Sequence, residues 1–283
     1  MSLYFPDIII EGSGMSGREE NLSGLKSITV HGGKATYAES GKGVSIVAVH
    51  GVHGSYRVWR AMEPELTADF RVLSVNLPGI EGTSFKAGQG YSQKHVARFL
   101  SNFAKAMGLE KYFLMAHSWA GAASIHLAAR QNNILGLVLF ATVGPRIHKG
   151  WKTTPRPSTV SKLLLIPGMK KALRKPISRT FHNIGVSESA PYHELVHATH
   201  YSGHLDFRQI DLDLKRLRQP TFLVWSEDDR VVDSDIFNEM AAKCPEGPRI
   251  KFSTGGHMPQ KTRAHEVGEQ LRPWLSRICG QEA

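Results

Sequence analysis

The stretch Ala116–Gly121, which reads Ala-His-Ser-Trp-Ala-Gly, decides how this chain folds. It follows the apolar run 112–115 and precedes the alanine-rich residues 122–130. This order predicts a strand, a tight turn that carries the serine, and a helix, which together form a nucleophile elbow of the small-x-Ser-x-small type. Such a turn lifts the Ser118 hydroxyl above the sheet edge. It also leaves the Trp119 N–H free at the positive end of the helix.

Any serine can lie between two small residues by chance, so the interpretation depends on the rest of the chain. Upstream, the apolar and β-branched run 44–49 is followed by His-Gly-Val-His-Gly at residues 50–54. A strand that ends in His-Gly can turn the Val52 N–H toward the serine. Val52 and Trp119 would then donate two hydrogen bonds to an oxyanion, each contributing about 3 kcal/mol in the transition state. The alternative is a plain glycine turn, and His50 is expected to brace this loop rather than to react.

Two further segments have the same arrangement of a short strand followed by polar residues. The apolar run 221–225 precedes Ser-Glu-Asp-Asp at residues 226–229, and the run 249–253 precedes Thr-Gly-Gly-His at residues 254–257. The chain order is therefore serine, acid and histidine, which is the order of the α/β-hydrolase triad. In that interpretation, His257 takes the proton from Ser118, and an aspartate fixes the tautomer of the histidine and stabilises the imidazolium.

With these motifs, the chain resembles an α/β-hydrolase of the epoxide hydrolase, haloalkane dehalogenase and C–C hydrolase branch. The resemblance covers about residues 25–278 and includes His50-Gly51, Asn76–Gly79, Gly108–Lys111, the elbow and the two polar loops. Epoxide hydrolases and haloalkane dehalogenases carry an aspartate nucleophile, where this chain has Ser118. An alkyl-enzyme ester cannot form by their route, so the resemblance leaves acyl-transfer chemistry.

The resemblance also chooses between Asp228 and Asp229. In the Gly-x-x-Asp pattern of the family, the acid lies three residues after the glycine, whose place Ser226 takes here. This register selects Asp229. The family's Asp-x-Pro-Gly-x-Gly-x-Ser loop departs more strongly at residues 76–84, where the leading acid is Asn76 and one residue is inserted. No function is carried over to that loop.

Alternating strand and helix patterns predict an α/β-hydrolase fold with a mostly parallel, eight-stranded sheet flanked by helices. A helix is expected from the N-cap Ser92 to Gly108. Residues 1–24 are polar and predicted to form an arm, while residues 25–144 and 218–283 form the core. The expected strands lie near residues 25–30, 34–39, 44–49, 70–76, 111–116, 134–141, 220–225 and 248–253.

The alternation breaks between residues 145 and 217, a gap too long for a structureless loop. This branch of the family inserts a helical cap at that place, and the segments 189–204 and 212–217 have helical spacing. A cap over the serine would exclude water and shape the substrate pocket.

The positive charge of the chain is concentrated within this predicted cap. Residues 145–187 contain ten Lys or Arg and no Asp or Glu, against 35 basic and 25 acidic residues in the whole chain. An apolar run at residues 163–169 lies beside Lys170, Lys171, Arg174 and Lys175. Such a combination fits contact with anionic lipid, attraction of an anionic substrate, or a solvated cap surface. Nucleic-acid binding is not expected, because no nucleic-acid-binding module accompanies the basic run.

The sequence predicts a cytoplasmic serine hydrolase that cleaves a carboxylic ester, thioester or lactone through an acyl-enzyme on Ser118. The alternatives are a C–C bond hydrolase, a lipid-directed acyl hydrolase, or a ligand receptor that retains the triad. No metal or organic cofactor is implied, and the two cysteines suggest neither a disulfide framework nor a metal site. The oligomeric state and the substrate are left open.

Overall fold

A computed structural model describes residues 24–152, 155–183, 186 and 188–281 of the chain. It confirms the predicted eight-stranded sheet. Each of the eight strands lies within two residues of its expected bounds. The predicted arm, apart from its last residue, lies outside the described residues. The strands are β1 (Lys26–Val30), β2 (Gly33–Ser40), β3 (Val44–Val49), β4 (Phe70–Val75), β5 (Tyr112–His117), β6 (Ile134–Phe140), β7 (Thr221–Ser226) and β8 (Arg249–Phe252).

The order of the strands across the sheet is β1-β2-β4-β3-β5-β6-β7-β8. The β1–β2 and β2–β4 pairs are antiparallel, and the strands from β4 to β8 all run parallel to one another. Within the parallel part, His117 pairs with Phe140, and Ser226 pairs with Phe252. The carboxyl ends of β5, β7 and β8 therefore open onto one edge of the sheet, where parallel α/β proteins place their sites.

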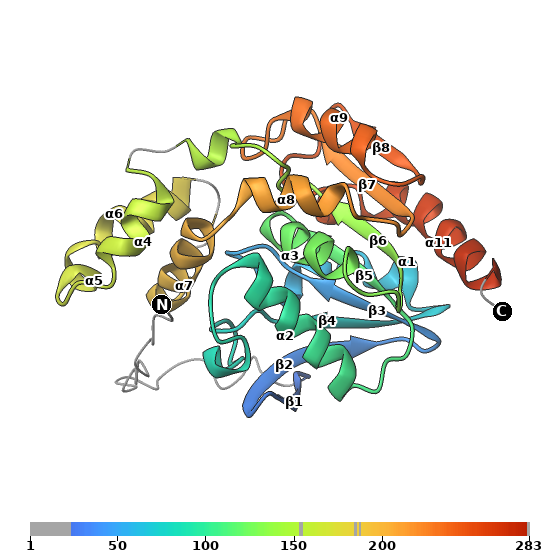
Figure 1. Ribbon diagram of the computed structural model, residues 1–283, viewed down its shortest axis with the longest axis horizontal. Helices are drawn as coiled ribbons and strands as arrows, with labels where there is room; N and C mark the ends of the chain where they lie inside the picture. The colour runs from blue at the N-terminus through green and yellow to red at the C-terminus, as the bar shows by residue number, and fades with distance from the viewer. Residues whose placement is uncertain (1–23, 153–154, 184–185, 187, 282–283) are drawn as a thin grey trace.

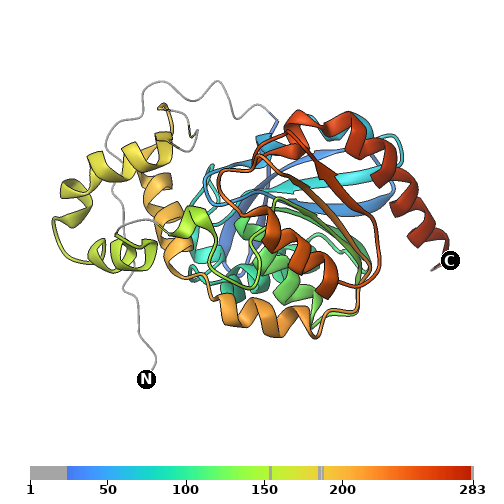
Figure 2. The ribbon, with the colours of Figure 1, turned by 90° about the horizontal axis from the view of Figure 1, so that it is seen from above.

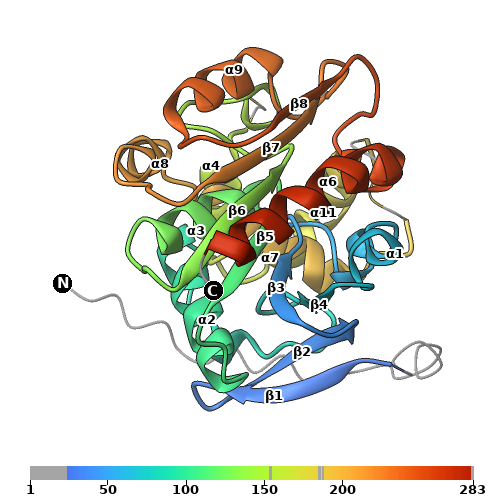
Figure 3. The same cartoon turned by 90° about the vertical axis from the view of Figure 1, so that its right-hand side faces the viewer.

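Helices cover both faces of the sheet (Figure 3). On one face, α2 (Gln93–Ala106) and α3 (Trp119–Ala128) bury Phe99, Phe103 and other apolar side chains in a core shared with Leu114 of β5. On the other face, α1 (Glu63–Leu66) and α11 (Ala264–Gln281) form a second core that includes Phe113 of β5. Successive side chains of β5 thus pack into opposite cores, because side chains alternate between the two faces of a strand and both faces of this strand are buried.

The helix α2 begins and ends where the sequence predicts. The Ser92 side chain accepts a hydrogen bond from the His95 N–H, so Ser92 is the N-cap. Gly108 follows the helix with a φ of +68°, a conformation that glycine adopts without strain. None of the helices in the described part of the chain combines the length and the hydropathy that a membrane-spanning segment needs.

Between β6 and β7 the described chain is helical. The elements there are η4 (Lys149–Trp151), α4 (Pro157–Leu163), α5 (Met169–Ala172), α6 (Arg174–Asn183), α7 (Tyr192–Gly203) and α8 (Phe207–Leu214). In Figures 1 and 2, α4, α5 and α6 stand at one end of the molecule, away from the sheet, with α7 between them and the core. The division of the chain into core and cap at residues 145 and 217 stays a prediction.

The last of these helices, α8, packs on α3 of the core. Asp213 of α8 is fully buried and accepts hydrogen bonds from Arg130 and Gln209, at 2.7 and 2.8 Å. Its other oxygen lies 2.7 Å from Nδ1 of His126 in α3. Because α7 leads directly into α8, this buried carboxylate anchors one end of the helical insertion to the core.

Candidate active site

Ser118 occupies the turn between β5 and α3, as the elbow motif predicts. Its backbone has a φ of 54° and a ψ of −126°, a combination that a non-glycine residue keeps only when its surroundings hold it there. The Ser118 N–H donates to the Phe140 carbonyl at 3.0 Å. The Ser118 carbonyl accepts from the Gly121 N–H at 3.0 Å and from the Thr142 hydroxyl at 2.9 Å. These bonds lock the serine at the sheet edge.

Close packing explains why small residues surround the serine. A Cβ at Gly121 would lie 1.6 Å from Oγ1 of Thr142, the same hydroxyl that holds the Ser118 carbonyl. A Cβ at Gly51 would lie 3.0 Å from both Cβ of Ser118 and Nδ1 of His117. Glycine at position 51 therefore lets the loop after β3 approach the elbow.

The structure brings the three predicted triad residues together. Nε2 of His257 lies 2.9 Å from Oγ of Ser118, and Nδ1 of His257 lies 2.8 Å from Oδ2 of Asp229. Ser118 is 5% exposed, and the Asp229 side chain is fully buried. This chain of hydrogen bonds can move a proton from the serine hydroxyl to the imidazole, with the carboxylate orienting the ring.

The two neighbouring aspartates have different partners. The second oxygen of Asp229 accepts from the N–H groups of Val231 and Val232, at 2.7 and 3.1 Å, which fixes the carboxylate that faces the histidine. Asp228 instead accepts from the N–H groups of Gly255 and Gly256, at 3.0 and 2.8 Å. The hydrogen bond from Gly256 lowers the pKa of Asp228 below its usual value. Asp229 thus contacts the histidine, whereas Asp228 holds the loop that carries it.

The predicted oxyanion donors, Val52 and Trp119, flank the serine on two elements. Trp119 is the first residue of α3, where a backbone N–H has no partner within the helix. Val52 follows Gly51, whose close approach to the elbow was described above. Within the described part of the chain, neither N–H donates to a backbone carbonyl. Both residues are buried.

His50 braces this loop, as expected, rather than joining the triad. The fully buried ring lies 2.7 Å from the Gly51 carbonyl through Nδ1 and accepts the Leu77 N–H at 3.0 Å through Nε2. Because Nε2 accepts, Nδ1 carries the proton that bonds Gly51. Burial lowers the pKa of His50 to about 4, so the ring stays neutral and keeps both bonds at neutral pH. Asn76 of the neighbouring loop is also structural: it accepts the Tyr56 N–H at 2.8 Å.

Sequence reasoning missed His117, the residue before the serine. Its Nε2 lies 2.7 Å from the carbonyl oxygen of His257, so Nε2 is the donor. The ring is 1% exposed, and burial together with the nearby His257 holds the pKa of His117 well below its usual value. His117 therefore fixes the backbone of the triad histidine. Only its place in the elbow could have indicated this, since the motif puts no demand on that residue type.

Residues of the helical insertion contact residues beside the site. The indole N–H of Trp119 donates to the Tyr201 carbonyl of α7 at 2.9 Å, and the Tyr201 hydroxyl donates to the Pro78 carbonyl at 2.8 Å. The ring of Phe181 in α6 meets the ring of His53 edge-on, with 6.1 Å between centroids. Helices of the insertion thus lie against both loops that carry the oxyanion donors.

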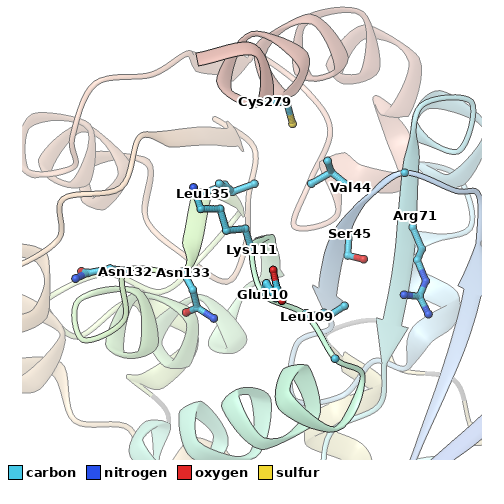
Figure 4. Close-up of a pocket in the computed structure, with 12 residues that line it drawn as sticks. Val44, Ser45, Arg71, Leu109, Glu110, Lys111, Asn132, Asn133, Leu135 and Cys279 are labelled. Carbon is cyan, nitrogen blue, oxygen red and sulfur yellow. The ribbon is translucent and has the colours of Figure 1, made fainter. Parts of the chain in front are cut away.

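A separate open groove of about 880 Å³ lies far from these residues (Figure 4). Its lining includes Val44, Lys111 and Leu135, which lie at the amino ends of β3, β5 and β6. The triad occupies the carboxyl ends of the parallel strands, so this groove is not part of the candidate active site. Among the described side chains, no group of three His, Cys, Asp or Glu could hold a metal ion.

Comparison with known proteins shows the family. The model of the alpha/beta hydrolase family matches residues 46–270 of the chain, which is more than half of its length. The chain therefore belongs to the alpha/beta hydrolase family. This agrees with the resemblance that the sequence motifs carry.

The dihydrolipoyllysine-residue acetyltransferase component of the acetoin cleaving system from Pseudomonas putida is 26% identical over 246 residues, covering 82% of this chain and 64% of that protein. The chain thus spans less than two thirds of that relative's length.

Two solved structures share the fold. Haloalkane dehalogenase DbeA from Bradyrhizobium elkani USDA94 gives a TM-score of 0.72 at 19% identity, covering 91% of this chain and 99% of its own. A putative lipase from Acinetobacter baumannii AYE gives 0.72 at 21% identity, covering 93% and 94%. At these identities the likeness shows the fold alone.

Proposed function

We propose that this protein is a serine hydrolase that cleaves a carboxylic ester, thioester or lactone through an acyl-enzyme on Ser118. One observation carries the proposal: the hydrogen-bonded line from Ser118 Oγ through His257 to Asp229, with distances of 2.9 and 2.8 Å. A serine held this way is activated toward a carbonyl carbon. A dehalogenase route would need a carboxylate at this position, and Ser118 cannot supply one.

The first half of the proposed reaction uses this arrangement of residues. Ser118 Oγ attacks the carbonyl carbon while its proton passes to Nε2 of His257. The carbonyl oxygen takes the negative charge, and the N–H groups of Val52 and Trp119 donate to it. When the tetrahedral intermediate collapses, the bond to the leaving group breaks. The departing alcohol or thiol takes the proton from His257, and the acyl group remains on Ser118.

The second half regenerates the enzyme. A water molecule gives a proton to His257 and attacks the acyl carbon, and collapse returns the proton to Ser118 Oγ as the carboxylic acid leaves. Asp229 keeps the imidazole in the productive tautomer in both halves. No step in this sequence requires a metal ion or an organic cofactor.

The helical insertion is proposed to act as a lid that determines which substrate binds. The Tyr201 carbonyl accepts a hydrogen bond from the Trp119 indole, and the Phe181 ring packs edge-on against the His53 ring. Both contacts lie beside the proposed oxyanion donors. Side chains of α6 and α7 would therefore select the acyl and alcohol groups and exclude water from the intermediate.

The test is hydrolysis of p-nitrophenyl esters of graded acyl length by the purified chain, with Ser118→Ala as the control. The proposal expects turnover with a maximum at one acyl length and loss of that turnover in the control. Tight binding of an ester without turnover would instead favour a ligand receptor that retains the triad. Turnover that persists in Ser118→Ala would reject Ser118 as the nucleophile.

A further inference from the structure

The helical insertion ends in a turn that exposes two large aliphatic side chains. Leu165 and Ile166 follow α4 and are 57% and 52% exposed, although their neighbour Leu164 is 1% exposed. Backbone hydrogen bonds hold this turn in place. The Leu165 N–H donates to the Lys162 carbonyl at 3.1 Å, and the Ile166 N–H donates to the Leu163 carbonyl at 3.0 Å. An ordered turn therefore presents both side chains to the surroundings.

Exposed basic side chains occur in the helices that precede and follow this turn along the chain. They are Lys162 at the end of α4, Lys171 in α5, and Lys175 and Arg179 in α6. Within the described part of the chain, no ion pair joins any of these four to an acidic side chain. No acidic residue occurs between positions 145 and 187, so nothing within the segment itself offsets this charge.

The helix α6 divides these residues onto two sides. Ile177 and Phe181, four residues apart, are buried at 5% and 8% exposure, whereas Lys175 and Arg179, also four apart, are exposed. Residues at this spacing share one side of a helix. The apolar side of α6 is therefore buried against the protein, and its basic side is exposed to solvent. Figures 1 and 2 show the helices α4 to α6 at the end of the molecule away from the sheet.

From this arrangement we propose that the residues named above form a membrane-binding tip: Leu165 and Ile166 enter the headgroup region of an anionic bilayer, and Lys162, Lys171, Lys175 and Arg179 bind its phosphate groups. Exposed aliphatic side chains in a segment that also carries exposed lysine and arginine match the two parts of such a surface, because apolar area enters the acyl boundary while basic groups meet anionic headgroups.

The tip is fixed in relation to the active site. The Tyr192 hydroxyl of α7 donates to the Lys170 carbonyl at 2.6 Å, and the Arg174 guanidinium lies 5.4 Å from the Tyr192 ring centre. At its other end, α7 carries Tyr201, which accepts the indole N–H of Trp119. A bilayer bound at the tip would thus hold the proposed active site at a set position above the membrane. Binding itself does not depend on the reaction at Ser118.

The experiment measures partitioning of the full chain onto vesicles of phosphatidylcholine alone and of phosphatidylcholine mixed with phosphatidylserine. The variant Lys162→Gln, Lys171→Gln, Lys175→Gln, Arg179→Gln removes the four basic side chains of the tip. Its matched control removes four exposed basic side chains elsewhere: Lys42→Gln, Lys94→Gln, Lys105→Gln, Arg277→Gln. A third variant, Leu165→Ser with Ile166→Ser, removes the apolar part. Thermal melts and turnover of a soluble short-chain ester check that each variant is folded.

We expect binding to the anionic vesicles that weakens as salt rises from about 0.1 to 1 M, because the Debye length falls from about 10 to about 3 Å. Each basic residue near an anionic surface contributes about fivefold, so the tip variant should lose at least about a hundredfold. The serine variant should lose about tenfold. The matched control should change binding by less than about threefold, and Ser118→Ala should bind like the parent chain.

Several results would overturn the proposal. Equal loss of vesicle binding in the tip variant and its control would show that binding depends on the net charge of the chain and not on the tip. Displacement of the chain from vesicles by inorganic phosphate at constant ionic strength would mean that the four basic side chains bind a free anion. Absence of vesicle binding together with concentration-dependent dimers that Leu165→Ser disrupts would make the tip a contact between copies of the chain.

Discussion

The core around Ser118 and the tip around Leu165 use charge in opposite ways. At the site, the Asp229 carboxylate is buried and both its oxygens have protein partners. At the tip, basic side chains are exposed and no acidic residue lies in the segment. A buried charge must be satisfied within the fold, since burying it unpaired is costly. An exposed charge without an ion-pair partner has little effect on the stability of the fold and is available to bind another molecule.

The largest expected effect separates the two neighbouring aspartates at the site. Asp229→Asn should lower kcat by about 10⁴, because an amide facing Nδ1 favours the wrong tautomer of His257. Asp228→Asn should lower kcat less than about tenfold, since an amide oxygen can still accept from Gly255 and Gly256. Steady-state kinetics on an ester substrate compare the two, with circular dichroism as the check of folding. The reverse order would mean that the acid is misassigned by one residue.

A smaller effect tests how the core anchors the insertion. Asp213→Ala should lower the free energy of unfolding by about 3 kcal/mol, because it leaves the polar groups of His126, Arg130 and Gln209 without their shared acceptor. Urea unfolding measures the change. Asp213→Asn serves as the control and should cost less, since its amide oxygen still accepts a hydrogen bond. A change below about 0.5 kcal/mol in Asp213→Ala would show that this anchor is dispensable.

The adjacent residues Leu164 and Leu165 sharpen the contrast within the tip itself. Leu164→Ala should destabilise the protein by about 2–4 kcal/mol, because its side chain is buried in the larger core. Leu165→Ala should change the stability by less than about 0.5 kcal/mol, as surface substitutions do. Thermal melts of both variants give the comparison. Equal destabilisation would mean that Leu165 packs against the protein instead of facing outward.

The smallest expected effect concerns pH. Burial lowers the pKa of His50, His197 and His200 to about 4, from 6.5 for an exposed histidine. Between these values the unfolded chain binds more protons than the folded one. The stability is therefore complete above about pH 6.5 and is lost as the pH falls toward 4.

Each such histidine steepens the pH dependence of stability by up to about 1.4 kcal/mol per pH unit. Urea unfolding of the parent chain and of His200→Gln between pH 7 and 4.5 isolates one of them. The variant should show the shallower slope. Parallel slopes would mean that His200 titrates alike in the folded and unfolded chains.

The sequence predicted the core better than the insertion because short-range patterns specify the core. The parallel strands β3 to β7 are mostly apolar runs between turn residues. Close packing also requires small residues beside Ser118, as the approach of Gly121 to Thr142 shows. The candidate triad was proposed for the same reason, since each member follows a strand that ends at one edge.

What the sequence could not predict depends on contacts between distant segments. His117 bonds the carbonyl of His257, 140 residues away, and no local pattern specifies that pair. Likewise, Leu164 and Leu165 are identical residues in one apolar run, and only the packing of α4 against its neighbours decides which of them is buried. The pairing of Trp119 with Tyr201 is of the same kind.

The most direct test of the central claim is labelling with a fluorophosphonate probe followed by peptide mass spectrometry. The probe reacts with a serine that a neighbouring base activates. The geometry at His257 predicts a single adduct, on the peptide that contains Ser118, and no adduct in a folded Ser118→Ala variant. An adduct on another serine, or labelling that survives Ser118→Ala, would contradict the assignment of Ser118 as the nucleophile and with it the proposed reaction.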